Sequence, residues 1–159
     1  MRVSRLSNFL FTIFVSPEAV VALLCLLPYY YFFDSLAELG GMLKTDAEIW
    51  KYLPTLTLGF SGVAFVVSSK IRAPLENFSN KALYEWPHYQ LLVDRVLISL
   101  GFSVICGVAS LAIWMLGTRL SAEVIGVVFL VATSVSATTA LTMFLAQQRV
   151  RELVDRYGT

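Results

Sequence analysis

The chain has 159 residues and a formal net charge of +1, with 57% apolar and only 14% charged residues. Soluble domains carry about a quarter charged residues, and each Asp, Lys or Arg at mid-bilayer costs roughly 2.5–3.5 kcal/mol on insertion scales. The composition therefore indicates a membrane protein of one domain, and the near-neutral charge argues against a general nucleic-acid binder.

The N-terminal residues resemble the beginning of a signal peptide, because Arg2 and Arg5 precede an apolar run. No small-residue cleavage site follows, so we expect this region to be retained. Two forms of the first span fit the pattern. Either 8–33 is one tilted helix, or 3–15 lies at the interface and the span covers 16–33.

The second form is favoured by good helix-start chemistry. Ser16 can cap a helix, Pro17 suits its first position, and Glu18 is an acid in the first turn. We interpret Glu18 as a helix-start residue near the headgroups. The alternative is an acid that functions inside the membrane.

A polar interval follows over 34–51, with four acids and two lysines. The pair Gly40–Gly41 is expected to end a short helix within it. Thr45 and Glu48 have the spacing of a capping box, which predicts the start of the helix that forms the second span, 52–69.

The second half of the chain is predicted to form a second membrane hairpin. The segment 70–95 is the longest polar interval between apolar runs, and it is followed by the predicted spans 96–116 and 121–146. The residues 147–159 continue as a charged helical tail. The prediction is an all-α integral membrane protein in which four transmembrane helices form two hairpins joined by the segment 70–95, as a single domain 1–159.

The distribution of basic residues predicts the orientation. Nine of the 12 Lys and Arg residues lie in the N-terminal region, in 70–95 and in the tail. Because cytosolic loops carry an excess of Lys and Arg, we expect both termini and 70–95 in the cytosol and 34–51 outside. The expected location is the inner (cytoplasmic) membrane.

No catalytic, cofactor-binding or metal-binding residues are predicted. His88 is the single histidine, and Cys25 and Cys106 both lie within apolar runs. One histidine without a nearby cysteine does not make an ordinary zinc site, and no phosphate-binding or nucleophile motif is present. We therefore expect a non-enzymatic protein without a cofactor.

Small and hydroxyl residues recur every four positions in the third and fourth spans, which places each set on one helix face. We expect these stripes to pack helices within a chain or between copies, so homo-oligomerisation is predicted. The alternative is a hydroxyl-lined pore formed by several copies. The packing residues are Ser99, Ser103, Gly107, Ala132, Ser136 and Ala140, with a second stripe at Ser134, Thr138 and Thr142.

Most charged groups on the cytosolic side belong to 70–95 and the tail. We expect them to dock a soluble cytosolic partner, with no direct contact to nucleic acid. The alternative is that the basic residues only set topology and touch anionic headgroups. The predicted docking residues are Arg72, Lys81, Glu85, His88, Asp94, Arg95, Arg149, Arg151, Glu152 and Arg156.

In size, span number, cytosolic termini and lack of catalytic motifs, the chain resembles the small four-span membrane subunit of the Kiwa anti-phage defence system of bacteria. The resemblance implies a homotetrameric inner-membrane sensor of phage attack that works with a cytosolic, DNA-binding partner subunit. It transfers no site residues. The expected function is a non-enzymatic sensor or scaffold, and the alternative is a small oligomeric pore or channel-forming effector.

Overall fold

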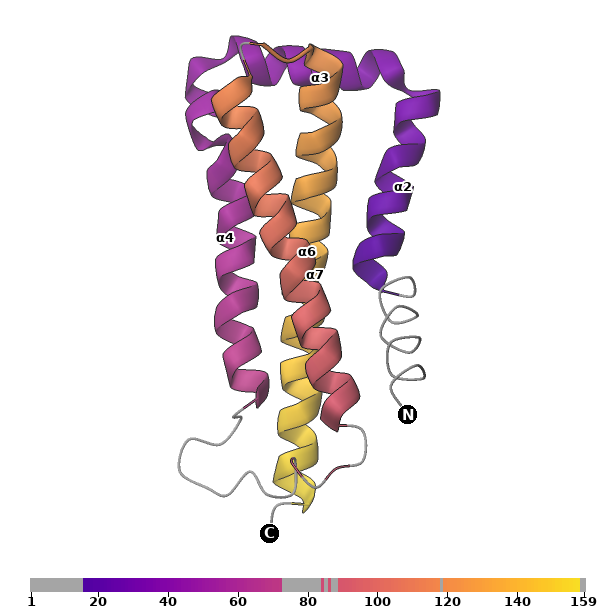
Figure 1. Ribbon diagram of the computed structural model, residues 1–159, viewed down its shortest axis with the longest axis vertical. Helices are drawn as coiled ribbons and strands as arrows, with labels where there is room; N and C mark the ends of the chain where they lie inside the picture. Colours follow the sequence, from indigo (N-terminus) through magenta and orange to yellow (C-terminus); the bar gives the residue numbers. More distant parts are fainter. Residues whose placement is uncertain (1–15, 73–83, 85, 87–88, 118, 158–159) are drawn as a thin grey trace, which may run out of the picture.

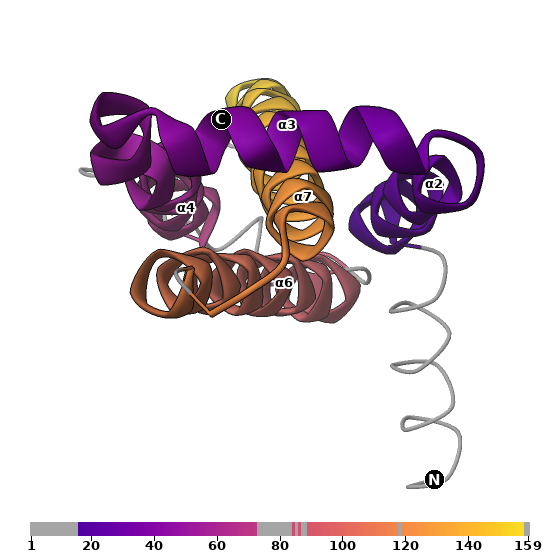
Figure 2. The ribbon, with the colours of Figure 1, turned by 90° about the horizontal axis from the view of Figure 1, so that it is seen from above.

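The computed structural model describes residues 16–72, 84, 86, 89–117 and 119–157. These residues form five helices: α2 (Pro17–Tyr31), α3 (Phe33–Thr45), α4 (Ala47–Arg72), α6 (Tyr89–Leu116) and α7 (Ala122–Tyr157). The described part of the chain is therefore all-helical, as predicted. Helices α4, α6 and α7 run side by side, α2 lies next to α7, and α3 crosses one end of the bundle (Figures 1 and 2).

Three of these helices are long and apolar enough to cross a membrane. They cover Ala47–Ile71 in α4, Tyr89–Leu116 in α6 and Ala122–Glu152 in α7. Helices α4 and α6 contain the predicted spans 52–69 and 96–116, and α7 covers all of 121–146 except Ser121, which precedes it. Each helix also extends beyond its predicted span, because it continues into a polar end. The apolar part of α2 is shorter, Pro17–Leu27. The four-span arrangement and the orientation therefore remain predictions, and residues 8–15 lie outside the described part.

The outer surface of the bundle is strongly apolar. Large apolar side chains are exposed on every long helix, including Leu23 on α2, Phe65 on α4, Ile105 on α6 and Leu145 on α7. Soluble monomers seldom expose apolar patches of this extent, whereas a lipid-facing surface requires them. The surface pattern thus supports a membrane location independently of hydropathy.

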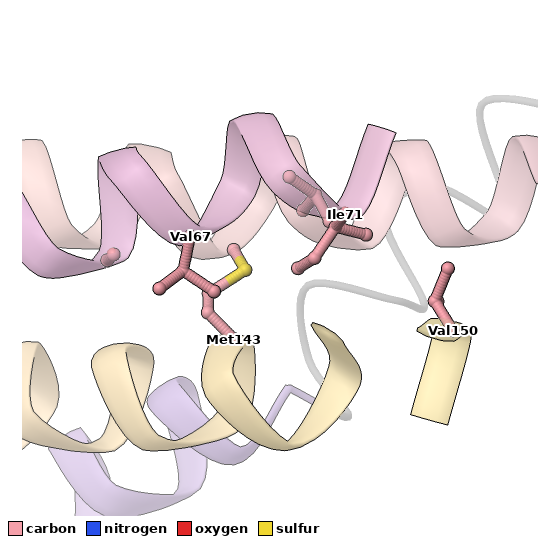
Figure 3. Packing of buried hydrophobic residues seen from close by; sticks show 6 residues of the cluster. Val67, Ile71, Met143 and Val150 are labelled. Atoms are coloured by element: carbon pink, nitrogen blue, oxygen red, sulfur yellow. The ribbon is translucent and has the colours of Figure 1, made fainter. Parts of the chain in front are cut away.

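The interior of the described bundle contains three apolar clusters. Away from α3, Val67 and Ile71 of α4 pack with Met143 and Val150 of α7, and Val96 of α6 joins them (Figure 3). At the end of the bundle that α3 crosses, a second cluster is formed by Leu43, Leu53, Ile113 and Ile125. The third cluster joins α6 to α7 through Cys106, Ala132 and Val135. Together the three clusters hold α4, α6 and α7 against one another.

Helix α3 is amphipathic and crosses α7 at close range. It buries Leu36, Gly40 and Leu43 and exposes its acids. A Cβ atom on Gly40 would collide with the carbonyl of Ala122, and one on Gly126 would collide with the carbonyl of Leu36. The expectation that the glycine pair ends a helix is therefore wrong. Gly40 lies inside α3 because α7 leaves no room there for a side chain.

The start of α4 also differs from the expectation. Thr45 is the last residue of α3, and its hydroxyl donates to the Gly41 carbonyl oxygen at 2.7 Å. The cap is Asp46, whose Oδ1 accepts the backbone N–H of Glu48 at 2.9 Å and of Ile49 at 3.2 Å. The predicted capping box is wrong because α3 continues through Thr45 and leaves Asp46 alone between the two helices.

Candidate functional site

The site begins at the first turn of α2. The helix starts at Pro17, and Ser16 Oγ accepts the backbone N–H of Ala19 at 3.0 Å. The predicted helix start is confirmed. This cap places Glu18 in the first turn, where the positive end of the helix dipole favours a carboxylate.

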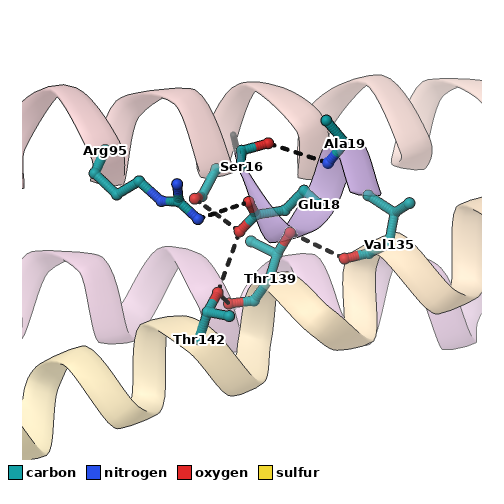
Figure 4. A network of polar contacts seen from close by, with 8 residues as sticks. Ser16, Glu18, Ala19, Arg95, Val135, Thr139 and Thr142 are labelled. Atoms are coloured by element: carbon teal, nitrogen blue, oxygen red, sulfur yellow. Dashed lines mark hydrogen bonds and ion pairs between the residues drawn. The ribbon is translucent and has the colours of Figure 1, made fainter. Parts of the chain in front are cut away.

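The Glu18 side chain points into the protein rather than toward headgroups. It is 0% exposed and is held by two neighbouring helices. Oε1 accepts the hydroxyl of Ser99 at 2.8 Å and that of Thr142 at 3.2 Å, and Oε2 accepts Nη2 of Arg95 at 3.2 Å (Figure 4). The carboxylate is thus the point at which α2 is joined to α6 and α7 by polar contacts. Glu18 is a helix-start residue, as predicted, and its depth in the membrane stays a prediction.

Arg95 reaches this carboxylate from the second turn of α6, just before the predicted span 96–116. Its side chain is 31% exposed, whereas that of Glu18 is fully buried. Ser99 lies one turn farther along α6, about 6 Å at a rise of 1.5 Å per residue. The guanidinium is therefore directed toward the buried carboxylate and still keeps part of its surface exposed, whereas basic side chains near a membrane surface usually extend outward to water.

The Glu18–Arg95 pair contributes more to the position of α2 than to the free energy of unfolding. A hydrogen bond to a charged group contributes about 1.5–3 kcal/mol, but desolvation costs several kcal/mol per ion. The intact pair is therefore close to balanced. Removing Arg95 alone leaves the buried Glu18 carboxylate without its counter-charge, which is strongly unfavourable. The pair therefore stabilises the position of α2 in which Glu18 contacts Arg95, because any other position leaves the buried charge unpaired.

Thr142 is the weakest of the three donors. Its single hydroxyl hydrogen has two acceptors, Glu18 Oε1 at 3.2 Å and the Thr139 carbonyl oxygen at 3.1 Å. A hydroxyl donates one hydrogen, so these two contacts compete. Arg95 and Ser99, both on α6, therefore provide the main attachment of the carboxylate.

The predicted packing residues all lie in the interior. Ser103 donates to Ser61 Oγ at 2.8 Å and so joins α6 to α4. A Cβ on Gly107 would lie 3.3 Å from Leu58 Cδ2, which shows how closely these two helices pack. Ser99, Ser103, Gly107, Ala132, Ser136 and Ala140 are all buried. Ser99 also has a role that its place in a packing stripe did not suggest, because its hydroxyl binds Glu18.

The predicted docking residues are described only in part. Arg149 and Glu152 form an exposed pair on α7 with an N–O distance of 3.6 Å, and Arg151 next to them is also exposed. Asp94 is half-buried, and Arg95 is turned toward Glu18. Lys81, Glu85 and His88 lie outside the described residues, as do the side chains of Arg72 and Arg156.

The pairing of Glu18 with Arg95 was missed from the sequence. A signal existed, since an acid at the edge of an apolar run requires a partner. Arg95 is the last cation before the third predicted span. However, Lys51, Lys70 and Arg119 also border apolar runs. Only the folded arrangement selects among them.

Among the residues that the structure describes, no group of three or more His, Cys, Asp or Glu side chains is arranged to hold a metal ion. No protein-family model matches the chain, and searches of the curated proteins and of the solved structures also gave no match. The geometry of the Glu18 cluster is therefore the basis for a functional proposal.

Proposed function

We propose that the chain is a non-enzymatic inner-membrane sensor or scaffold subunit in which the Glu18–Arg95 pair connects α2 to a cytosolic docking region. The single observation behind this proposal is the fully buried Glu18 carboxylate held by α6 and α7. An ionisable group placed inside a membrane protein is costly, and such groups commonly mark functional sites.

The position of α2 suits an element that responds to the membrane. Its outward face exposes Leu23, Leu24 and Leu27, and its inward contacts include Val21 and Ala22 packed near Cys106. A disturbance of the surrounding lipid acts directly on such a peripheral helix. Because the polar attachment of α2 is localised at Glu18, its movement changes the surroundings of Arg95.

Arg95 transmits this change toward the proposed docking region. It lies less than two turns from Tyr89, the first residue of α6, and the central segment 70–95 ends at Arg95 itself. In the proposal this segment and the tail bind a soluble cytosolic partner through their mixed charges. Several copies of the chain would bring these segments together, and the resemblance to the Kiwa membrane subunit extends the proposal to a tetramer in anti-phage defence.

The packing stripes do not favour the pore alternative. Ser103 and Ser136, which would have to face a water-filled channel between copies, are buried within a single chain. A pore would need other hydroxyl groups, or a rearranged bundle, to line its wall. The sensor or scaffold is therefore the proposal that requires the fewest changes to the described helices.

The experiment compares partner retention between variants. The tagged chain is purified from its native membranes, and the soluble proteins retained with it are quantified by mass spectrometry. We expect Arg95→Met to lose a partner that the wild type retains, with unchanged membrane insertion. Arg119→Met is the matched control, since it removes an exposed positive charge that makes no contact with Glu18.

Two results would contradict the proposal. One is equal partner retention by Arg95→Met and the wild type. The other is selective ion conductance by the pure chain in liposomes, which would instead support the pore.

A further inference from the structure

A second feature lies at the opposite end of α4, where two hollows adjoin. The first is a shallow apolar groove of about 400 Å³ between α4 and α7, lined by Glu48, Ile49, Tyr52, Leu53, Leu56 and Phe129. The second, of about 670 Å³, lies at the corner between α3 and α4 and is lined by Met42, Thr45, Asp46, Ala47, Glu48 and Ile49.

The two hollows differ in chemistry and share one border. Glu48 and Ile49 line both of them, so the hollows lie next to each other. The corner hollow carries the acids Asp46 and Glu48, whereas the remaining walls of the groove are aromatic or aliphatic apart from the hydroxyl of Tyr52. From Glu48 to Leu56 the groove descends eight residues, about 12 Å along the helix. This polar-to-apolar order matches that of a phospholipid.

The charges at the border indicate the kind of headgroup. Glu48 pairs with Lys51 at 3.7 Å, and the two side chains are 80% and 67% exposed. An exposed pair of this kind contributes little stability, so both charges remain accessible to a ligand. A zwitterionic headgroup offers a cation for Glu48 and a phosphate for Lys51. With Asp46 nearby, the corner favours the cationic part, and a primary ammonium supplies three hydrogen-bond donors.

We propose that this groove binds one phosphatidylethanolamine molecule. Its ammonium lies in the corner hollow at Asp46 and Glu48, its phosphate lies near Lys51, and one acyl chain follows Ile49 and Leu56 down the groove. The site is separate from the Glu18 cluster, which lies toward the other end of the bundle, so it extends the proposed function rather than depending on it.

The test is native mass spectrometry of the full chain in detergent, titrated with phosphatidylethanolamine or phosphatidylglycerol of identical acyl chains. We expect the wild type to retain one phosphatidylethanolamine in preference to phosphatidylglycerol. Glu48→Gln should reduce this preference on the order of fivefold, the effect of one charge at a membrane surface. Glu152→Gln is the matched control, because it removes an acid from a similar exposed i,i+3 pair at the far end of α7.

A second variant tests the acyl-chain part of the site. Leu56→Trp fills the groove at a half-exposed position and should lower retention of both lipids without affecting the fold. Equal retention of the two lipids by the wild type, or an unchanged preference in Glu48→Gln, would overturn the assignment. Unchanged retention in Leu56→Trp, or a second copy of the chain that occupies the groove and excludes lipid, would do the same.

Discussion

The Glu18 carboxylate and the Arg95 guanidinium lie 3.2 Å apart although 77 positions separate them in the chain. The contact joins the first turn of α2 to the second turn of α6. The long helices carry no Asp, Glu, Lys or Arg over 52–69, 96–116 and 124–146. The Glu18–Arg95 pair is therefore the feature from which the proposed coupling between membrane and cytosol follows.

The crossing of α3 and α7 should depend on the absence of a side chain at Gly40. Gly40→Ala would drive its Cβ against the Ala122 backbone, and overpacking of this kind costs about 1–3 kcal/mol. Gly41→Ala is the matched control, because a Cβ there meets nothing within 4 Å. Alanine should stabilise the helix at that position by roughly 0.5–1 kcal/mol. The free energy of unfolding in mixed detergent micelles is measured for both variants. Equal changes for Gly40→Ala and Gly41→Ala would show that the close crossing of α3 and α7 is absent.

The buried face of α7 should reject a larger side chain at Ser136, which is 0% exposed. We expect Ser136→Leu to destabilise the fold or its assembly by about 1–3 kcal/mol, because the added volume separates the helices. Thr55→Leu makes a comparable change at an exposed position of α4 and should be well tolerated. Thermal stability and size in detergent provide the readout, and a wild-type profile for Ser136→Leu would place this stripe against lipid.

The orientation can be tested with single cysteines in a chain whose native Cys25 and Cys106 have been replaced. Glu38 is exposed on α3, so Glu38→Cys should react with an impermeant reagent added to intact cells. Asn80→Cys in the central segment should react only after the membrane is opened. Labelling of position 80 but not of position 38 from outside would show that the orientation is the reverse of the predicted one.

Partner docking and lipid contact can be separated by the acids of the central region. Binding to anionic headgroups requires only basic residues, whereas a protein interface of mixed charge also uses acids. Reversing the charge of Glu85 and Asp94 together should therefore abolish partner retention while insertion and the oligomer remain intact. Wild-type partner retention by that double variant would leave 70–95 as a connection between spans without a docking role.

Local chemistry made part of this fold predictable. The start of α2 follows from Ser16 and Pro17, whose effects act within one helical turn. The positions of α4, α6 and α7 follow from long apolar runs. Their ends extend beyond the predicted spans because a helix need not stop where its apolar run stops.

Features that depend on distant residues were not predictable in this way. A glycine pair in a polar interval suggests a helix end, but Gly40 is required by α7, which begins more than 80 positions later. Thr45 and Asp46 are both good capping residues, and only the extent of α3 decides between them. The pairing of Glu18 with Arg95 likewise results from the packing of three helices.

The measurement that tests the Glu18–Arg95 attachment most directly is a double-mutant cycle of the free energy of unfolding in mixed detergent micelles. The variants are Glu18→Gln, Arg95→Met and the two combined. Arg95→Met should cost the most, on the order of 3 kcal/mol, because it leaves a buried carboxylate unpaired. The combined variant should be less destabilised than the sum, with a coupling energy of about 1–3 kcal/mol. Additive effects, within about 0.3 kcal/mol, would show that the two side chains act independently and would contradict the attachment of α2 to α6 through this pair.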